Sequence, residues 1–194
     1  VIDETLMIIK RILNEFHVLA YNPKDKSGFL RHIIIRKGHV SHELMVIFVM
    51  QNKPFPYERE IVQAILEKCP NVVSIIQNIN VHHNNIVMGP HQRVLFGGDI
   101  YMDELMGLKF SISSKSFLQV NSIQTEKLYQ HALKLANIKK DEIWLDAFCG
   151  IGTITLVASS YAKHVYGIEV VKDAIKMANI NKSINQISNV TFEV

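Results

Sequence analysis

The sequence has few cysteines, little excess charge and no long apolar run, and each absence excludes a class of protein. The two cysteines, Cys69 and Cys149, stand in unrelated contexts, which excludes a disulfide framework and fits no zinc site. The net charge of +3 permits a nucleic-acid partner without requiring one. No uncharged stretch reaches the roughly 20 residues that cross a bilayer, so we expect a cytoplasmic protein that does not bind membranes.

The remaining composition is that of a folded globular protein. Apolar residues make up 48% of the 194 residues, and charged residues make up 20%. Of the nine histidines, His82 and His83 are adjacent, and adjacent side chains point in different directions, so we predict no metal site there. The chain starts at Val1 without a methionine and ends at Val194 within a predicted strand. We interpret it as a piece of a longer protein.

The first 115 residues predict an α+β domain. Apolar residues at spacings of three and four predict an amphipathic helix over 2–16, and a second helix is expected over 58–69. Two β-branched runs on either side of Gly38 predict an antiparallel pair of strands. The predicted strands cover 33–35, 44–50, 72–79, 86–88, 94–96, 100–105 and 110–113, in a mostly antiparallel sheet.

The pattern changes after Ser116, where strands and helices begin to alternate. Strands are predicted at 142–148, 164–168 and 190–194, with a helix before the first strand and one in each connection. Repeated β-α-β order predicts a parallel sheet, with the strands in spatial order 3-2-1 and the first strand at an edge. We therefore divide the chain into domains 1–115 and 116–194.

The segment EIWLDAFCGIGTITL carries the clearest functional signal. A predicted strand ends at Asp146, and Gly150 and Gly152 follow in a turn that opens a helix. Glycine lets a ligand approach the backbone closely, and the first N–H groups of a helix are free to donate. Glu169 ends the next strand, where a carboxylate can accept hydrogen bonds from both ribose hydroxyls of a nucleoside. The pattern predicts a site for an adenosyl group.

Other interpretations of these residues stay open. The two glycines also suit a plain tight connection between strand and helix, which Asp146 caps. A nicotinamide dinucleotide uses the same layout, but its G-x-G-x-x-G pattern has a third glycine where this chain has Thr155. Cys149 beside the turn is more typical of small packing volume than of a reactive thiol. The order D-x-x-x-G-x-G favours S-adenosylmethionine as the ligand.

The run KSFLQVNSIQTEKLY, followed along the chain by LDAFCGIGTITL, resembles the RNA uracil-5-methyltransferases that act on transfer and ribosomal RNA. The stretches GFLRHIIIRKG, NVVSIIQNIN and LFGGDIYMDELMGLKFSISSKSFLQVN resemble the central domain of the same family, in that order. The resemblance covers nearly the whole chain. It implies an α+β central domain followed by the first half of a class I S-adenosylmethionine-dependent methyltransferase domain, which has a Rossmann-like α/β fold.

The resemblance also implies which residues bind S-adenosylmethionine. They are the Gln of the QVN motif, the aromatic residue before Cys-Gly, the two glycines, the residue after them and the acid that ends the second strand: Gln119, Phe148, Gly150, Gly152, Thr153 and Glu169. Thr153 stands where some members have Asn, which keeps a polar side chain at the helix start. Taken singly, Gln119 also suits a helix cap and Phe148 a core position.

The implied reaction is methylation of C5 of a uridine in 23S ribosomal RNA or transfer RNA. In the family, a cysteine thiolate adds to C6 of uracil, C5 takes the methyl group, and a carboxylate removes the C5 proton before the cysteine leaves. We expect both groups beyond Val194, so the sequence predicts no catalytic residue within the chain, which should be inactive alone. Many members carry an RNA-binding barrel and an iron-sulfur cluster on four cysteines, and this piece has neither. The full-length protein is expected to be a monomer.

For RNA contact, the sequence offers one basic hairpin and one aromatic residue. The candidates are Arg31, His32, Arg36 and Lys37 on the hairpin and Phe117 beside the QVN motif, as a stacking ring. A solvated hairpin and a core Phe are equally typical of these residues. Two other functions stay open: another adenosyl- or dinucleotide-binding enzyme of the same fold, and a non-catalytic RNA-binding or interaction module.

Overall fold

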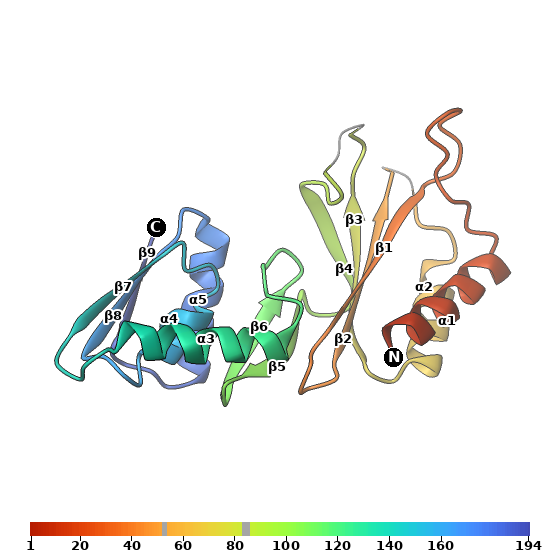
Figure 1. Cartoon of the computed structure of the whole chain (residues 1–194). Coiled ribbons are helices and arrows are strands. Elements are labelled where there is room, and N and C mark those ends of the chain that lie inside the picture. The colour runs from red at the N-terminus through yellow and green to blue at the C-terminus, as the bar shows by residue number, and fades with distance from the viewer. Residues whose placement is uncertain (52–53, 83–85) are drawn as a thin grey trace. The chain divides into compact units, whose positions relative to one another are not determined.

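The computed structural model describes residues 1–51, 54–82 and 86–194, which form two compact units, each with its own strands (Figure 1). The first unit comprises Val1–Gly38 and His42–Tyr101, and the second comprises His39–Ser41 and Met102–Val194. The second unit therefore contains strand β6 (Leu108–Ser113) and most of strand β5 (Ile100–Leu105), which pair with each other. The domain boundary between residues 115 and 116 stays a prediction.

The first unit is built on a four-stranded mixed sheet. Its strands lie in the order β1 (Leu30–Lys37), β2 (Leu44–Met50), β3 (Val72–Ile79) and β4 (His91–Gly97). β1 and β2 are antiparallel, as predicted, and so are β3 and β4. β2 and β3 are parallel, and helix α2 (Glu58–Lys68) makes the crossover that a parallel pair requires. The sheet is thus antiparallel in two of its three pairings.

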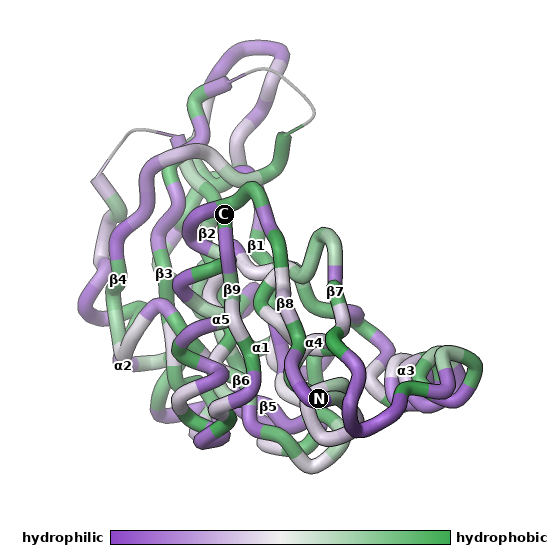
Figure 2. Tube along the Cα trace, turned by 90° about the vertical axis from the view of Figure 1, so that its left-hand side faces the viewer, coloured by the Kyte–Doolittle hydropathy of each residue, from purple (hydrophilic) through white to green (hydrophobic). Residues whose placement is uncertain are grey.

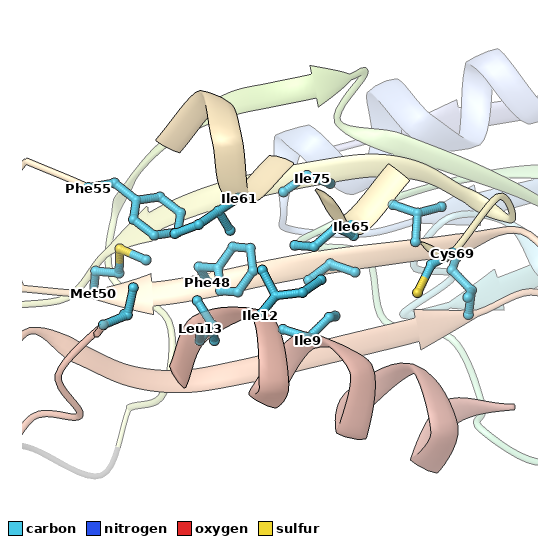
Figure 3. Close-up of a cluster of buried hydrophobic side chains, with 14 residues drawn as sticks. Ile9, Ile12, Leu13, Phe48, Met50, Phe55, Ile61, Ile65, Cys69 and Ile75 are labelled. Atoms are coloured by element: carbon cyan, nitrogen blue, oxygen red, sulfur yellow. The ribbon is translucent and has the colours of Figure 1, made fainter. Parts of the chain in front are cut away.

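The core of the first unit lies between this sheet and the helices α1 (Ile2–Glu15) and α2. Ile9, Ile12 and Leu13 of α1 recur on one helical stripe and are buried, as the amphipathic pattern predicts. Figure 3 shows them beside Phe48 of β2, with Ile61 and Ile65 of α2 packed against the same ring. Burying one such side chain contributes about 1.5–3 kcal/mol, so this cluster holds both helices on the sheet.

The strand predicted over 86–88 is wrong. These residues form no strand, because the buried side chain of Asn80 binds their backbone in place of a strand partner. Its Nδ2 donates to the carbonyl oxygens of Ile86 at 2.7 Å and Val87 at 3.0 Å. In the preceding turn, His82 is exposed, and His83 lies outside the described residues.

The second unit contains a three-stranded parallel sheet in the order β7 (Ile143–Ala147), β8 (His164–Ile168) and β9 (Val190–Glu193). Both the predicted order and the edge position of the first strand are confirmed. Helices α4 (Thr153–Ala158) and α5 (Lys172–Ile184) make the crossovers, and α3 (Ser122–Ala136) precedes the sheet. Apolar and polar residues alternate around α3 and α5 (Figure 2). Among the described residues, no helix is long and apolar enough to span a membrane.

Candidate functional site

The turn between β7 and α4 has an unusual backbone conformation at three positions. Phe148, Gly150 and Gly152 all have positive φ, at 67°, 56° and 82°. A Cβ added to Gly152 would lie 2.5 Å from Cζ of Phe192, so only glycine fits there. A Cβ added to Gly150 would meet no atom within 4 Å. Gly152 is therefore needed for packing, whereas Gly150 borders open space that a ligand can enter.

Side chains from neighbouring elements hold this turn in place. The Asp146 carboxylate accepts a hydrogen bond from the Thr155 hydroxyl in the first turn of α4, and burial raises the pKa of Asp146. The hydroxyl of Tyr129 on α3 lies 2.7 Å from Oγ1 of Thr153. Asp146 thus ties the strand end to the helix start through the Thr155 side chain, whereas the N-cap of α4 is Gly152, with no side-chain cap hydrogen bond.

Glu169 occupies the position at the end of β8 that suits a ribose. Its Oε2 accepts from the Gly150 N–H at 3.2 Å, and its Oε1 accepts from the Val171 N–H at 3.0 Å. Each carboxylate oxygen can accept a second hydrogen bond, so two hydroxyls can still bind. The two backbone donors orient the carboxylate before any ligand arrives.

A pocket of about 190 Å³ opens beside Glu169. It lies where the segment after β6, the glycine turn and the start of α5 meet, and all of these segments belong to the second unit. The lining residues are Ser113, Lys115, Ser116, Phe117, Gly150, Ile151, Glu169, Val171, Asp173 and Ala174. Parallel sheets of this kind bind ligands at the carboxyl ends of their strands, and β7 and β8 both end here.

Three of the predicted site residues meet in this pocket: Phe117, Gly150 and Glu169. Gln119 lines a second, much smaller pocket of about 10 Å³ with residues of β5, β6 and α3. Phe117 is 76% exposed and Phe148 is 87% exposed. The alternative prediction, that these two rings belong to the hydrophobic core, is therefore wrong. Thr153 is nearly buried, with its hydroxyl against Tyr129.

The site also uses residues that the sequence did not single out. Tyr129 meets Thr153, Phe192 packs against Gly152, and the fully buried Asn181 of α5 donates to the Ile151 carbonyl oxygen at 3.2 Å. Asn181 follows Ile175 and Ala178 on the buried stripe of α5. The sequence alone could have indicated Asn181, because it is a polar residue at a position of the helix where apolar residues are expected.

Neither cysteine has the properties of a nucleophile. Burial, together with the nearby carboxylates of Asp146 and Glu169, raises the pKa of Cys149 to about 12. Burial likewise raises the pKa of Cys69. Both thiols are therefore protonated at neutral pH. The position of the catalytic cysteine beyond Val194 stays a prediction.

The basic residues of the first hairpin do not form one patch. Arg31 donates to the carbonyl oxygens of Asn80 at 2.9 Å and His82 at 2.7 Å, and its guanidinium lies over the Tyr21 ring. These contacts give Arg31 a structural role. Residues of a strand point alternately to its two faces, so His32 and Arg36 share one face of β1 and Lys37 lies on the other.

Residues 52–193 match the family model of tRNA (uracil-5-)-methyltransferase. The chain belongs to this family. A protein of Oceanobacillus iheyensis described as an uncharacterized RNA methyltransferase is 44% identical over 193 residues, which are 100% of this chain and 42% of the relative. Its counterpart in Staphylococcus epidermidis is 46% identical over 191 residues, which are 98% of the chain and 42% of that protein. The chain thus spans 42% of the length of these curated relatives.

Solved structures of the tRNA (uracil-5-)-methyltransferase family and of other proteins share the fold. The tRNA (uracil-54, C5)-methyltransferase of Pyrococcus abyssi, in complex with S-adenosyl-L-homocysteine, has a TM-score of 0.80 and 26% identity, covering 98% of this chain and 45% of its own. A complex of aTrm5 with tRNALeu has a TM-score of 0.52 and 12% identity, covering 95% of this chain and 51% of its own, and shows the fold alone. The predicted Rossmann-like methyltransferase fold is confirmed.

Proposed function

We propose that this chain is part of a cytoplasmic enzyme that transfers a methyl group from S-adenosylmethionine to C5 of a uridine in ribosomal or transfer RNA. The observation that carries the proposal is the pocket in which Gly150 and Glu169 meet, at the carboxyl ends of two parallel strands. It occurs in a chain of the tRNA (uracil-5-)-methyltransferase family. The similar Pyrococcus abyssi enzyme was solved with S-adenosyl-L-homocysteine.

The residues of the pocket fit an adenosyl group. Glu169 offers two carboxylate oxygens to the ribose hydroxyls, and the missing side chain of Gly150 leaves space beside them. When bound, S-adenosylmethionine supplies the methyl group. The exposed ring of Phe117 lines the same pocket and can stack on a flat base, either of the ligand or of RNA. We propose that Gln119 and Phe148 complete the cofactor contacts.

The volume of the pocket is smaller than that of a typical site for a ligand as large as S-adenosylmethionine. Its 190 Å³ falls below the roughly 300 Å³ at which small-molecule sites begin. Because the chain spans 42% of its relatives, we propose that the rest of the protein supplies the remaining walls, the nucleophilic cysteine and the carboxylate base. The chain alone would then bind S-adenosylmethionine weakly and transfer no methyl group.

The test is methyl transfer by the full-length protein. It is incubated with methyl-labelled S-adenosylmethionine and unmodified transcripts of 23S ribosomal RNA and transfer RNA, and the RNA is digested to nucleosides. Label in 5-methyluridine is the expected result, and the transcript that carries it identifies the substrate. No label, or label in a different nucleoside, would contradict the proposed function.

The chain of residues 1–194, tested alone in the same assay, should yield no labelled nucleoside. Cys149 is the cysteine of the turn, and its protonated thiol is unsuited to attack uracil C6. Label in 5-methyluridine that survives Cys149→Ser in the short chain would show that the nucleophile has been misplaced.

A further inference from the structure

Strand β6 pairs with β5 along one edge, and two asparagine side chains of α5 bind its backbone. Oδ1 of Asn185 accepts from the Lys109 N–H at 2.9 Å, and its Nδ2 donates to the Lys109 carbonyl oxygen at 2.7 Å. One helical turn earlier, Oδ1 of Asn181 accepts from the Ser111 N–H at 2.7 Å. An edge strand leaves such backbone groups unpaired, and a carboxamide can both accept and donate. The two asparagines therefore dock α5 onto β6.

The two asparagines differ in what their amide nitrogens bind. Nδ2 of Asn185 donates to Lys109 and, at 2.8 Å, to the carbonyl oxygen of Asn181 within its own helix. Nδ2 of Asn181 donates instead to the carbonyl oxygen of Ile151, at 3.2 Å, between the two glycines of the turn. Asn181 is 0% exposed, so no water competes for either of its hydrogen bonds. It alone of the pair connects β6 to the glycine turn.

Both groups that Asn181 binds belong to segments that shape the candidate cofactor pocket. Ser111 lies two residues before Ser113, where the lining segment 113–117 begins, and Ile151 lines the pocket beside Gly150. If either segment moved, one end of a buried amide would lose its partner, and an unpaired buried polar group is costly. The spacing between the two segments is therefore set by the length of one side chain.

We propose that Asn181 is a positioning residue of the cofactor pocket, which holds the segment 113–117 and the glycine turn at the separation that the adenosyl ligand requires. It acts through the backbone of Ser111 and Ile151. This inference rests on the proposed function, because it assumes that the pocket binds S-adenosylmethionine.

The test compares Asn181→Leu with Asn185→Leu in the full-length protein. Leucine has the same branched outline and number of side-chain heavy atoms as asparagine, although it is bulkier, and it makes no hydrogen bond. Both variants therefore lose a contact to β6, and only the first loses the bond to the turn. We expect Asn181→Leu to weaken S-adenosylhomocysteine binding about tenfold or more by calorimetry, and Asn185→Leu to change it less than about twofold. The KM for S-adenosylmethionine should rise in parallel.

The outcomes separate the inference from the proposed function. If the unaltered protein does not bind S-adenosylhomocysteine, the proposed function fails and the inference fails with it. If it binds, and the two variants retain its affinity or lose it equally, Asn181 only docks the helix and the inference is wrong. Melting temperatures of both variants identify any loss that stems from unfolding.

A measurement on the unaltered protein covers the case in which Asn181→Leu does not fold. The Ser111 amide proton is bound to Asn181, and the Lys109 amide proton is bound to Asn185. If Asn181 transmits the position of the turn, S-adenosylhomocysteine should slow residue-resolved hydrogen exchange at Ser111 more than at Lys109. Equal protection at the two amides would overturn the proposal.

Discussion

At the scale of single residues, Glu169 has the largest part in the proposed site. Glu169→Ala should weaken S-adenosylhomocysteine binding by about 1–3 kcal/mol in the full-length protein, because the ribose hydroxyls lose a charged acceptor. Calorimetry measures the change. Glu169→Gln is the matched control, since it keeps one acceptor oxygen and should lose less. Unchanged affinity in the alanine variant would remove Glu169 from the site.

The two thiols provide a second test at this scale. With a pKa of about 12, only about one Cys149 thiol in ten thousand is ionised at pH 8. A disulfide reagent should therefore label native Cys149 at least about a thousandfold more slowly than the unfolded chain, and the native rate should rise with pH. Cys69 should also react slowly, since burial raises its pKa. Fast labelling of either native thiol at pH 8 would contradict the described burial.

Asp146 makes a prediction about pH and stability. Burial raises its pKa, so ionising it costs the folded state more than the unfolded one, and the stability present below the unfolded pKa is lost as pH rises through the folded value. Asn in its place can still accept from Thr155 and carries no charge. We expect Asp146→Asn to melt at least as high as the unaltered protein at pH 7, with the difference shrinking toward pH 4. A lower melting temperature at pH 7 would show that the charge itself is needed.

At the scale of elements, the two glycines of the turn should behave differently. Gly152→Ala should destabilise the protein by about 2–4 kcal/mol, because its φ is 82° and its new Cβ meets the Phe192 ring. Gly150→Ala should cost only about 1–2 kcal/mol, since it meets only the strain of a positive φ. Urea titrations measure both. The affinity for S-adenosylhomocysteine should nevertheless fall in Gly150→Ala, whose methyl group points into open space.

At the scale of the whole molecule, the parallel sheet has one unprotected side in the described chain. Ile143 and Leu145 of β7 are 64% and 60% exposed, and Tyr166 and Ile168 of β8 are exposed beside them. These residues share one face, and β7 is also an edge strand. Apolar surface of this kind marks a contact, and we propose that the rest of the protein covers it.

The chain of residues 1–194 alone should therefore self-associate. Sedimentation should show association that grows with concentration, and Leu145→Lys should reduce it. In the full-length protein the same change should lower the melting temperature, because it buries a charge. Val120→Lys is the control, since Val120 is fully exposed outside the sheet and should alter neither measurement. A short chain that stays monomeric at high concentration would contradict this account.

Sequence periodicity alone determined most of the secondary structure and the parallel order of the second sheet, because helix and strand stripes and β-α-β order are local properties. The sequence also predicted Gly150 and Glu169 as site residues, because each of them closely follows a strand of the parallel sheet. The tertiary structure decided which side chains meet over long separations: Arg31 with Asn80 and His82, Tyr129 with Thr153, and Asn181 with Ser111 and Ile151. Such contacts depend on how elements pack, which no local pattern specifies. These contacts show that Tyr129 and Asn181 support the segments around the pocket, whereas residues such as Gly150 and Glu169 line it.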